Sequence, residues 1–497
     1  MRSMGWRLER VAFLAVRLDI VLRGQRMRPK SQFRATHPIP DRMRNGNRPR
    51  PARALGLATC LLASACTSTP PADPIERELA LETFDKAWST IDETHYDPEF
   101  NGVDWAALRE ELRPRAMEAA THDELRSVLG EMLGRLNQSH FSVIPASALP
   151  AMQGVTAKTG EGGGKLSDAG DCGFDSRLRE GELVVTRVDA DGPAHLAGIR
   201  PGWVITHLGD LDIDEMVADM RSAKDALSER DIAFRAWRNA QRVAVGGVGT
   251  ELEVSLHDRD DEARSFTLKR QVRRAEEHSM GNLPTFYLRF WSERIEAGQQ
   301  EIGLVGFSNW FLPMMQPLNE ALESMRACEG IVIDLRGNSG GAGMMTMGLA
   351  GHFFEERVLL GTQRVRNGEM KFVAIPRQID SQGELLMHYA GPVAILSDEG
   401  TGSASEVFAG GMQSIGRARV FGETSAGAVL PATITELPNG DAMLHAFGDF
   451  KTATGELVEG TGVVPDEFAR LTREALIEGR DPALDAAIAW IQSNPQS

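Results

Sequence analysis

The stretch DEGTGSASEVFAGG, which begins at Asp398, contains a serine in a setting that could support nucleophilic chemistry. Ser403 follows an apolar run and precedes a helical pattern, so its hydroxyl is expected at a strand end, beside a helix N-terminus. The same residues also fit a simpler role, because Ser403-x-x-Glu406 ahead of an apolar run is a capping box. A serine nucleophile needs a base, so the choice between these two interpretations depends on finding one.

A second Gly-rich loop, in GIVIDLRGNSGG, follows another predicted buried strand. Backbone N–H groups that converge on one point can form an oxyanion hole, in which each donor contributes about 3 to 4 kcal/mol to acyl transfer. We therefore predict an oxyanion hole made by Ala404, Gly340 and Gly341. Asp334 and Arg336, in the same loop, are expected to form a structural ion pair.

The elements that must position these loops alternate between strands and helices after Glu301. IGLVGFSNW predicts a strand, PLNEALESMRA a helix and GIVIDL a second strand, and PVAILS and RARVFGE predict two more strands. A strand, a crossover helix and a strand form a βαβ unit, so the sheet should be at least partly parallel. Ligands of such sheets gather at the carboxyl ends of the strands, where both Gly-rich loops lie.

Upstream of this α/β part, two regions have different patterns. Apolar residues at helical spacing predict helices from Ile75 to about Leu136, after which LNQSHFSVIP predicts a turn into a strand. From about Gly170 to Gln271 short β segments dominate, interrupted by a helical insertion. Cys172 and Cys328 are expected to be buried thiols.

The N-terminus has the composition of a targeting segment. RPRPARALGLATCLLASAC has a basic start, an apolar stretch and small residues before Cys66, and ASAC resembles a bacterial lipobox, which implies lipidation of that cysteine. An ordinary secretory signal cut near Ala65 is the alternative. The long Arg-rich stretch ahead of it suggests a true start at Met43.

Charge excludes some classes of partner. The net charge is −16, and because residues 1–65 hold 14 Lys/Arg against 3 Asp/Glu, the rest carries 40 basic and 67 acidic residues, or −27. Such a surface disfavours nucleic acid. The sequence has no stretch of about 20 apolar residues to span a membrane, no metal-ligand spacing and no phosphate loop, so we expect neither a metal nor another cofactor.

Three ordered motifs, about 60 residues apart, resemble the C-terminal processing peptidases and the related tricorn-core-like serine peptidases: IVIDLRGNSGG, TGSASEVFAGGMQSIGRARVFGETSAG and EGTGVVPD. The resemblance implies an α/β fold with a ClpP/crotonase-like ββα catalytic core, an inserted mostly-β PDZ-like domain and a helical N-terminal region. GELVVTRVDADGPAHLAGIRPGWVITHLGD is itself similar to a PDZ domain, with DCGFD as its carboxylate-binding loop and Gly173 and Phe174 as peptide-binding residues. A β module that only packs on the enzyme is the alternative.

Processing peptidases of this family commonly use a lysine about 25 residues after the serine as the base. That position is Ala428 in this chain, and the only lysine after Ser403 is Lys451, which no motif places at the nucleophile. The expected lysine is therefore missing.

The tricorn-like branch instead implies a tetrad, whose matching residues here are Ser139, His140, Ser403 and Glu459. His140 would accept the Ser403 proton, because the unperturbed pKa of histidine lies closest to neutral pH. We assign the orienting and supporting roles to Glu459 and the Ser139 hydroxyl, without deciding which of them touches His140.

These observations predict four regions: a targeting segment (1–66), a tether and helical region (67–145), a PDZ-like domain (165–272) and a serine peptidase domain (273–497). The predicted function is a bacterial envelope serine endopeptidase that faces the periplasm. It is anchored to the membrane by lipid, and it cleaves polypeptides with a free C-terminus near that end. Two alternatives stay open. One is a non-catalytic protein on the same fold that binds retinoid, lipid or peptide, and the other is a Ser-Lys peptidase that uses Lys451.

Overall fold

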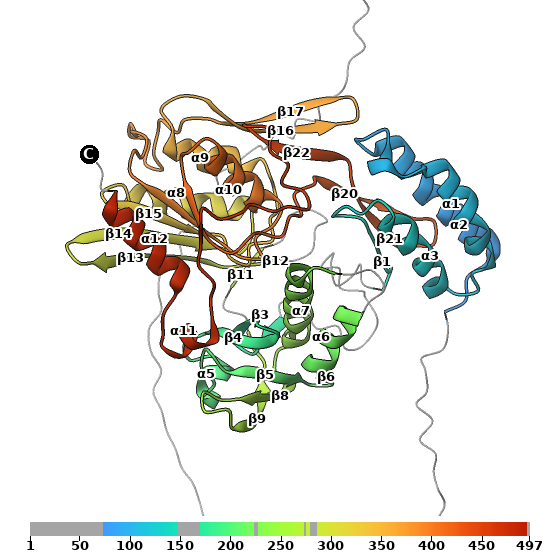
Figure 1. Ribbon diagram of the computed structural model, residues 1–497, viewed down its shortest axis with the longest axis horizontal. Helices are drawn as coiled ribbons and strands as arrows, with labels where there is room; N and C mark the ends of the chain where they lie inside the picture. Colours follow the sequence, from blue (N-terminus) through green and yellow to red (C-terminus); the bar gives the residue numbers. More distant parts are fainter. Residues whose placement is uncertain (1–72, 148–168, 223–226, 273–274, 279–285, 495–497) are drawn as a thin grey trace, which may run out of the picture. The chain divides into compact units, whose positions relative to one another are not determined.

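The computed structural model describes residues 73–147, 169–222, 227–272, 275–278 and 286–494 (Figure 1). All of them belong to one compact unit, Thr69–Ser497. The predicted targeting segment, with Cys66 and Met43, lies outside the described residues.

Three helices form the helical region: α1 (Arg77–Thr94), α2 (Trp105–Glu118) and α3 (His122–Gly134). Asp104 caps α2 by accepting the Ala107 N–H, and Thr121 caps α3 by accepting the Glu124 N–H. Their apolar faces share one core, in which Phe84, Leu112 and Leu129 are fully buried. The helices predicted from apolar spacing between residues 75 and 136 are confirmed.

The β module, residues 169–272 apart from 223–226, contains an antiparallel sheet in the order β3-β4-β5-β8-β9, with β6 (Leu211–Asp212) beside β5. The predicted short β segments and the helical insertion between them are both present. The strands are β3 (Phe174–Arg179), β4 (Glu182–Val188), β5 (Val204–Leu208), β8 (Glu251–His257) and β9 (Ala263–Lys269). The helices are α5 (Pro193–Ala197), α6 (Ile213–Ser222) and α7 (Glu229–Ala244). A small sheet joins β2 (Ala169–Asp171), β7 (Gly246–Gly247) and β10 (Gln271–Val272).

The C-terminal α/β part, residues 286–494, is built on a six-stranded sheet in the order β13-β14-β15-β18-β19-β23. All neighbouring pairs from β14 to β23 are parallel, and β13 is an antiparallel edge. The prediction of a partly parallel sheet in an α/β fold is therefore confirmed. The strands are β13 (Phe290–Ala297), β14 (Gln300–Phe307), β15 (Gly330–Asp334), β18 (Val393–Ser397), β19 (Arg419–Gly422) and β23 (Glu467–Phe468).

Helices cover both faces of this sheet (Figure 1). Alternate strand residues point to opposite faces, so Ile331 and Ile333 pack into the core with α8, α9 and α10, whereas Val332 packs into the core with α12. Strands that are covered on both faces consist mostly of apolar residues, so they could be recognised in the sequence as buried strands. The helices are α8 (Met315–Ser324), α9 (Met345–Ala350), α10 (Ala404–Ser414), α11 (Arg473–Ile477) and α12 (Pro482–Ser493).

Two smaller sheets join this core. One has the order β17-β16-β22, and the other, β1-β21-β20, takes its edge strand from the end of the helical region. Ser142 of β1 pairs with Leu444 of β21. The segment just after His140 is therefore joined to the α/β part by strand pairing. The strands are β1 (Ser142–Ile144), β16 (Val358–Val365), β17 (Gly368–Ala374), β20 (Ala432–Glu436), β21 (Ala442–Ala446) and β22 (Gly448–Thr452). A separate hairpin pairs β11 (Glu276–His278) with β12 (Phe286–Leu288).

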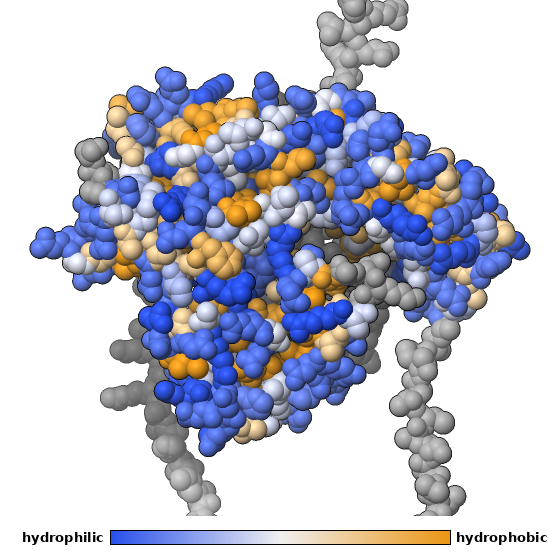
Figure 2. All heavy atoms as spheres, in the orientation of Figure 1, coloured by the Kyte–Doolittle hydropathy of each residue, from blue (hydrophilic) through white to orange (hydrophobic). Residues whose placement is uncertain are grey.

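Hydrophilic side chains cover most of the face drawn in Figure 2, and apolar residues form separate patches on it. Cys172 and Cys328 are both buried, as predicted. In the part of the chain that the structure describes, none of the helices combines the length and apolarity needed to cross a bilayer.

Candidate active site

Ser403 lies between the buried strand β18 and helix α10, as predicted, and its backbone is strained. Its φ of 54° and ψ of −118° are rarely adopted by a residue with a side chain. Gly340 makes room for this turn, because a Cβ at that position would lie 2.5 Å from the Ser403 Cβ. The Ser403 side chain is half-buried, so it lies at the protein surface. The neighbouring loop can approach it closely only because residue 340 is a glycine.

Glu406 holds the nucleophile loop in this conformation. Its buried carboxylate accepts the Ser403 N–H at 3.0 Å, while the Glu406 N–H donates to the Ser403 carbonyl at 2.9 Å. The same carboxylate accepts from Ser425 Oγ at 2.5 Å, from the Gly427 N–H at 2.6 Å and from the Ala428 N–H at 3.0 Å. Burial raises the pKa of Glu406 to about 7, although these hydrogen bonds oppose the shift. The carboxylate half of the predicted capping box thus also ties the loop 425–428 to the serine.

His140 lies at the end of the helical region and takes part in a relay with two other predicted residues. The distance from His140 Nδ1 to Ser139 Oγ is 2.7 Å, and Ser139 Oγ donates to Glu459 Oε2 at 3.0 Å. Since the single hydroxyl proton goes to the carboxylate, Ser139 must accept from Nδ1–H. This arrangement leaves the lone pair on His140 Nε2, which is the tautomer that a general base requires. Ser139 therefore touches His140 directly, and Glu459 touches Ser139.

A short backbone segment connects this relay to the nucleophile. Glu459 also accepts the N–H groups of Ser139 and Val429, at 2.7 and 3.0 Å, and the residue before Val429, Ala428, accepts the Ser403 N–H at 3.0 Å. His140 and Ser403 both lie in the part of the chain that the structure describes. In this conformation no hydrogen bond joins the His140 imidazole to the Ser403 hydroxyl. The structure thus brings the four tetrad residues onto one network, through Ala428 and Val429.

Burial shifts the pKa values of the two titratable relay residues in opposite directions. It lowers the pKa of His140 and raises that of Glu459, because a low-dielectric environment disfavours each charged form. Backbone and side-chain hydrogen bonds from Ser139 and Val429 act against the shift at Glu459. A lowered pKa keeps His140 neutral, and thus able to accept a proton, in mildly acidic solution.

The backbone donors around Ser403 differ from the predicted set in one respect. The N–H of Gly340 donates to Asn338 Oδ1 at 3.1 Å, so this donor is occupied. The N–H groups of Ala404 and Gly341 have no acceptor within the described part of the chain. Trp310 fixes the Gly loop by donating to the Gly340 carbonyl, and a Cβ on Gly341 would lie 2.3 Å from the Trp310 carbonyl oxygen. Ala404 and Gly341 are the two predicted donors left to receive an oxyanion.

Comparison with known proteins agrees with this geometry. Residues 301–468 match the model of peptidase family S41, and residues 78–134 match that of the tricorn protease C1 domain. This segment of the chain is therefore similar to the S41 peptidases. The chain is a serine-type peptidase, as predicted from the sequence, so the alternative of a non-catalytic binding protein is not supported.

Several proteins that this chain resembles are named for processing at carboxyl termini. The chain is 26% identical to carboxyl-terminal-processing peptidase 2 of Arabidopsis thaliana over 409 residues, which are 80% of this chain and 70% of that protein. It is also 26% identical to putative tricorn protease homolog 2 of Streptomyces coelicolor over 441 residues, 83% of this chain and 32% of that protein. The structure of photosystem II D1 C-terminal processing protease superposes with a TM-score of 0.51 at 22% identity, covering 82% of this chain and 96% of that one.

Two other residues considered from the sequence, Arg336 and Lys451, lie outside the relay. Arg336 forms the predicted ion pair with Asp334 at 2.8 Å and also pairs with Asp481, the N-cap of α12. Lys451 is an exposed residue of β22, opposite Thr362 of β16. Within the described ranges, no three His, Cys, Asp or Glu side chains lie together in a way that could hold a metal ion.

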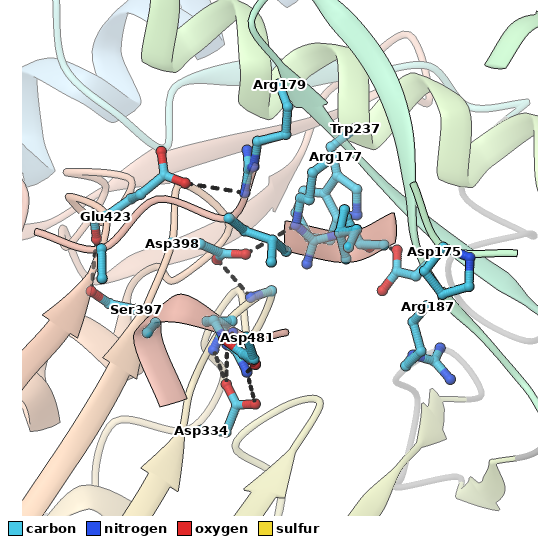
Figure 3. A pocket seen from close by; sticks show the side chains of 18 of the residues that line it. Asp175, Arg177, Arg179, Arg187, Trp237, Asp334, Ser397, Asp398, Glu423 and Asp481 are labelled. Carbon is cyan, nitrogen blue, oxygen red and sulfur yellow. Dashed lines mark hydrogen bonds and ion pairs between the residues drawn. The ribbon is translucent and has the colours of Figure 1, made fainter. Parts of the chain in front are cut away.

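Sequence reasoning missed how the β module contacts the active-site loops. Arg177 of β3 pairs with Asp398, in the loop before Ser403, at 2.9 Å, and Arg179 pairs with Glu423 at 3.4 Å (Figure 3). Arg179 also pairs with Glu399 of the same loop at 2.9 Å. Arg230 of α7 donates to the carbonyls of Gly460 and Thr461, next to Glu459. The sequence places Arg177 and Arg179 on the same face of one strand, which could have indicated a charged contact surface. Nothing in the sequence indicated which carboxylates they pair with.

In the predicted carboxylate-binding loop of the β module, a side-chain carboxylate of the loop itself accepts the backbone N–H of Gly173. Gly173 has a φ of 70°, and its N–H donates to Asp171 Oδ1 at 3.0 Å. Phe174 begins β3 and is buried. The loop conformation is the one that glycine permits, but this chain's own carboxylate occupies its donor.

Proposed function

We propose that this peptidase is an endopeptidase of the bacterial cell envelope that cleaves polypeptides near their C-termini through an acyl-enzyme. Ser403 acts as the nucleophile and His140 as the general base. The observation that carries the proposal is the continuous relay from His140 through Ser139 to Glu459, which Ala428 and Val429 join to the nucleophile loop. A histidine held in the correct tautomer can substitute for the missing lysine.

The reaction follows from these positions. When substrate brings the imidazole and hydroxyl to hydrogen-bond distance, His140 Nε2 takes the proton as Ser403 Oγ bonds to the carbonyl carbon. The N–H groups of Ala404 and Gly341 stabilise the oxyanion, as Gly340 supports the loop. His140 then donates its proton to the leaving nitrogen, the C–N bond breaks, and water hydrolyses the ester with His140 again as base. Ser139 and Glu459 stabilise the imidazolium in both halves.

The arrangement of the chain supports a division of roles among the predicted domains. We assign catalysis to a ClpP/crotonase-like domain (273–497), and recruitment of the substrate tail to a PDZ-like domain (165–272). The tether and helical region (67–145) delivers His140. An incoming C-terminus would replace the Asp171 carboxylate at Gly173, beside Phe174. The ion pairs from β3 to Asp398 and Glu399 give recruitment a direct physical connection to the nucleophile loop.

The location is proposed from the N-terminal sequence. ASAC before residue 67 suits processing and lipidation at Cys66, which would anchor the protein to the membrane with its catalytic part facing the periplasm. Metabolic labelling with a palmitate analogue tests this assignment. Label should enter the wild-type protein and be absent from Cys66→Ser, whereas an unlabelled wild-type protein of signal-cleaved mass would contradict lipidation.

An active-site probe tests the catalytic assignment. A fluorophosphonate should label the purified protein at Ser403, fail to label Ser403→Ala, and label His140→Ala far more slowly. Ser414→Ala, in the last turn of the same helix, is the matched control and should label normally. Labelling that persists in Ser403→Ala would contradict the nucleophile assignment, and an unchanged rate in His140→Ala would contradict the base.

A further inference from the structure

A cavity of about 690 Å³ lies between the β module and the C-terminal α/β part. Residues of α7, including Arg238 and Arg242, line one side, and Arg289 lines another. We call it the arginine cavity. A neighbouring cavity of about 630 Å³, drawn in Figure 3, shares Arg289 and Trp237 with it.

Most charges around the arginine cavity are paired inside the protein. Arg187 pairs with Asp189, and Asp175 accepts from both Arg177 and Gln241. These groups neutralise one another locally, so they leave little charge to attract a ligand.

Three arginines are exceptions. In the described residues, the guanidinium groups of Arg238, Arg242 and Arg289 have no carboxylate partner and donate no hydrogen bond. Arg238 and Arg242 are exposed, one helical turn apart on α7, whereas Arg289 is half-buried. The Arg289 backbone N–H donates to Ser308 Oγ, and its guanidinium lies 5.8 Å from the ring centroid of Trp291.

The surroundings of Arg289 disfavour its charged form, although three carboxylates lie near it. Burial and the neighbouring Arg187 lower the pKa of Arg289, even though Asp189, Asp175 and Asp171 act in the opposite direction. Each of these carboxylates is engaged by another group of the chain. An added anion would therefore gain a charge-assisted hydrogen bond without displacing an existing one.

The cavity also reaches the active-site loop. Asn309 and Ser339 line it, and Ser339 precedes Gly340, which packs against the Ser403 Cβ. The Asn309 side chain donates weakly to Ser339 Oγ at 3.4 Å. A polypeptide with one end in the arginine cavity would thus lie next to the loop that carries the proposed oxyanion donors.

We propose that Arg289, supported by Arg238 and Arg242, forms a subsite that binds a carboxylate of the polypeptide substrate. The carboxylate is either the chain terminus or an Asp or Glu side chain near it. This inference rests on the proposed peptidase function and names a substrate preference for it. Asp171 occupies the Gly173 N–H, whereas the Arg289 guanidinium is free of such a partner within the described residues and can receive an incoming carboxylate.

Four versions of one peptide test the subsite: Glu or Gln as the second-last residue, each with a free or an amidated C-terminus. Arg289→Gln should lower kcat/KM about tenfold or more through KM for peptides that carry the recognised carboxylate, and change the doubly neutral peptide little. Arg289→Lys should recover part of the loss. Arg357→Gln, an exposed arginine outside both cavities, is the matched control.

The pattern of loss identifies the source of the carboxylate. Loss that follows the free acid assigns the subsite to the terminus, and loss that follows Glu against Gln assigns it to a side chain. Equal loss for all four peptides, or no loss for any, would overturn the proposal.

Binding to Ser403→Ala separates this inference from the proposed function. Fluorescence anisotropy of the same labelled peptides, with and without Arg289→Gln in the Ser403→Ala background, reports carboxylate recognition when no cleavage occurs. A carboxylate preference that disappears with Arg289→Gln supports the subsite even for a protein that cleaves none of the peptides. Peptides that are cleaved by the wild type but bound without carboxylate preference would overturn the subsite alone.

Discussion

The two sides of the active site are held in different ways. On the nucleophile side, Ser403 and its strained turn are fixed by a buried carboxylate, Glu406, and by residues of the same C-terminal part. On the base side, His140 comes from the helical region and is half-buried. It is oriented through Ser139 by Glu459, which lies more than 300 residues away in sequence. The proposed nucleophile is therefore positioned by nearby residues of one part of the chain, whereas the proposed base depends on contacts between distant segments.

The largest expected effect is on the base side. His140→Gln should lower kcat/KM by roughly 10³-fold, because an amide cannot take the Ser403 proton. In the wild type, the acid limb of the pH profile should lie below the ordinary histidine pKa of 6.5, since burial lowers the pKa of His140. Steady-state kinetics from pH 5 to 9 checks both, and a normal rate in the variant would remove His140 from the mechanism.

Glu406→Gln should affect stability on the nucleophile side. The amide cannot accept four donors, so the free energy of unfolding should fall by about 3 kcal/mol at pH 8. Burial raises the folded-state pKa of Glu406 from about 4.5 to about 7. The folded wild type therefore binds this proton more tightly than the unfolded chain, and its stability should decrease as pH rises between those values.

Urea unfolding from pH 4.5 to 8 measures this slope. Glu406→Gln should flatten it, and the exposed Glu253→Gln should leave it unchanged. The same slope in Glu406→Gln as in the wild type would show that another group titrates there.

Ser139→Ala tests whether the Ser139 hydroxyl orients the proposed base, His140. Without its hydroxyl, His140 Nδ1 loses the acceptor that fixes the tautomer, so kcat should fall about tenfold with little change in KM. Ser142→Ala, on the exposed side of β1, is the control. Equal values of kcat for Ser139→Ala and Ser142→Ala would contradict the relay.

The smallest effect is expected for Lys451→Met. Because Lys451 is an exposed residue of β22, its replacement should change kcat/KM by less than about twofold. Measurement with the same peptides checks this, and a loss comparable to that of His140→Gln would revive a Ser-Lys mechanism.

Elements with strong local signals were predicted correctly. The strand Gly330–Asp334 and the helix after Ser403 lie where the sequence placed them, because apolar periodicity and glycine positions are properties of neighbouring residues. Gly340 was assigned to the oxyanion hole, but its N–H is occupied by Asn338. That difference depends on the direction of one peptide bond, which no local pattern encodes.

The sequence by itself determined the chemical types: a serine at a strand end, glycines opposite it, an early Ser-His pair and a late glutamate, with the usual lysine missing. The tertiary structure decided which of these atoms meet. The order of the relay, the role of Glu406 beyond helix capping, and the contacts of Arg177, Arg179 and Arg230 all join segments far apart in the chain. Hydrogen bonds and ion pairs depend on distance and direction in space, and these exist only after the sheets and helices have packed.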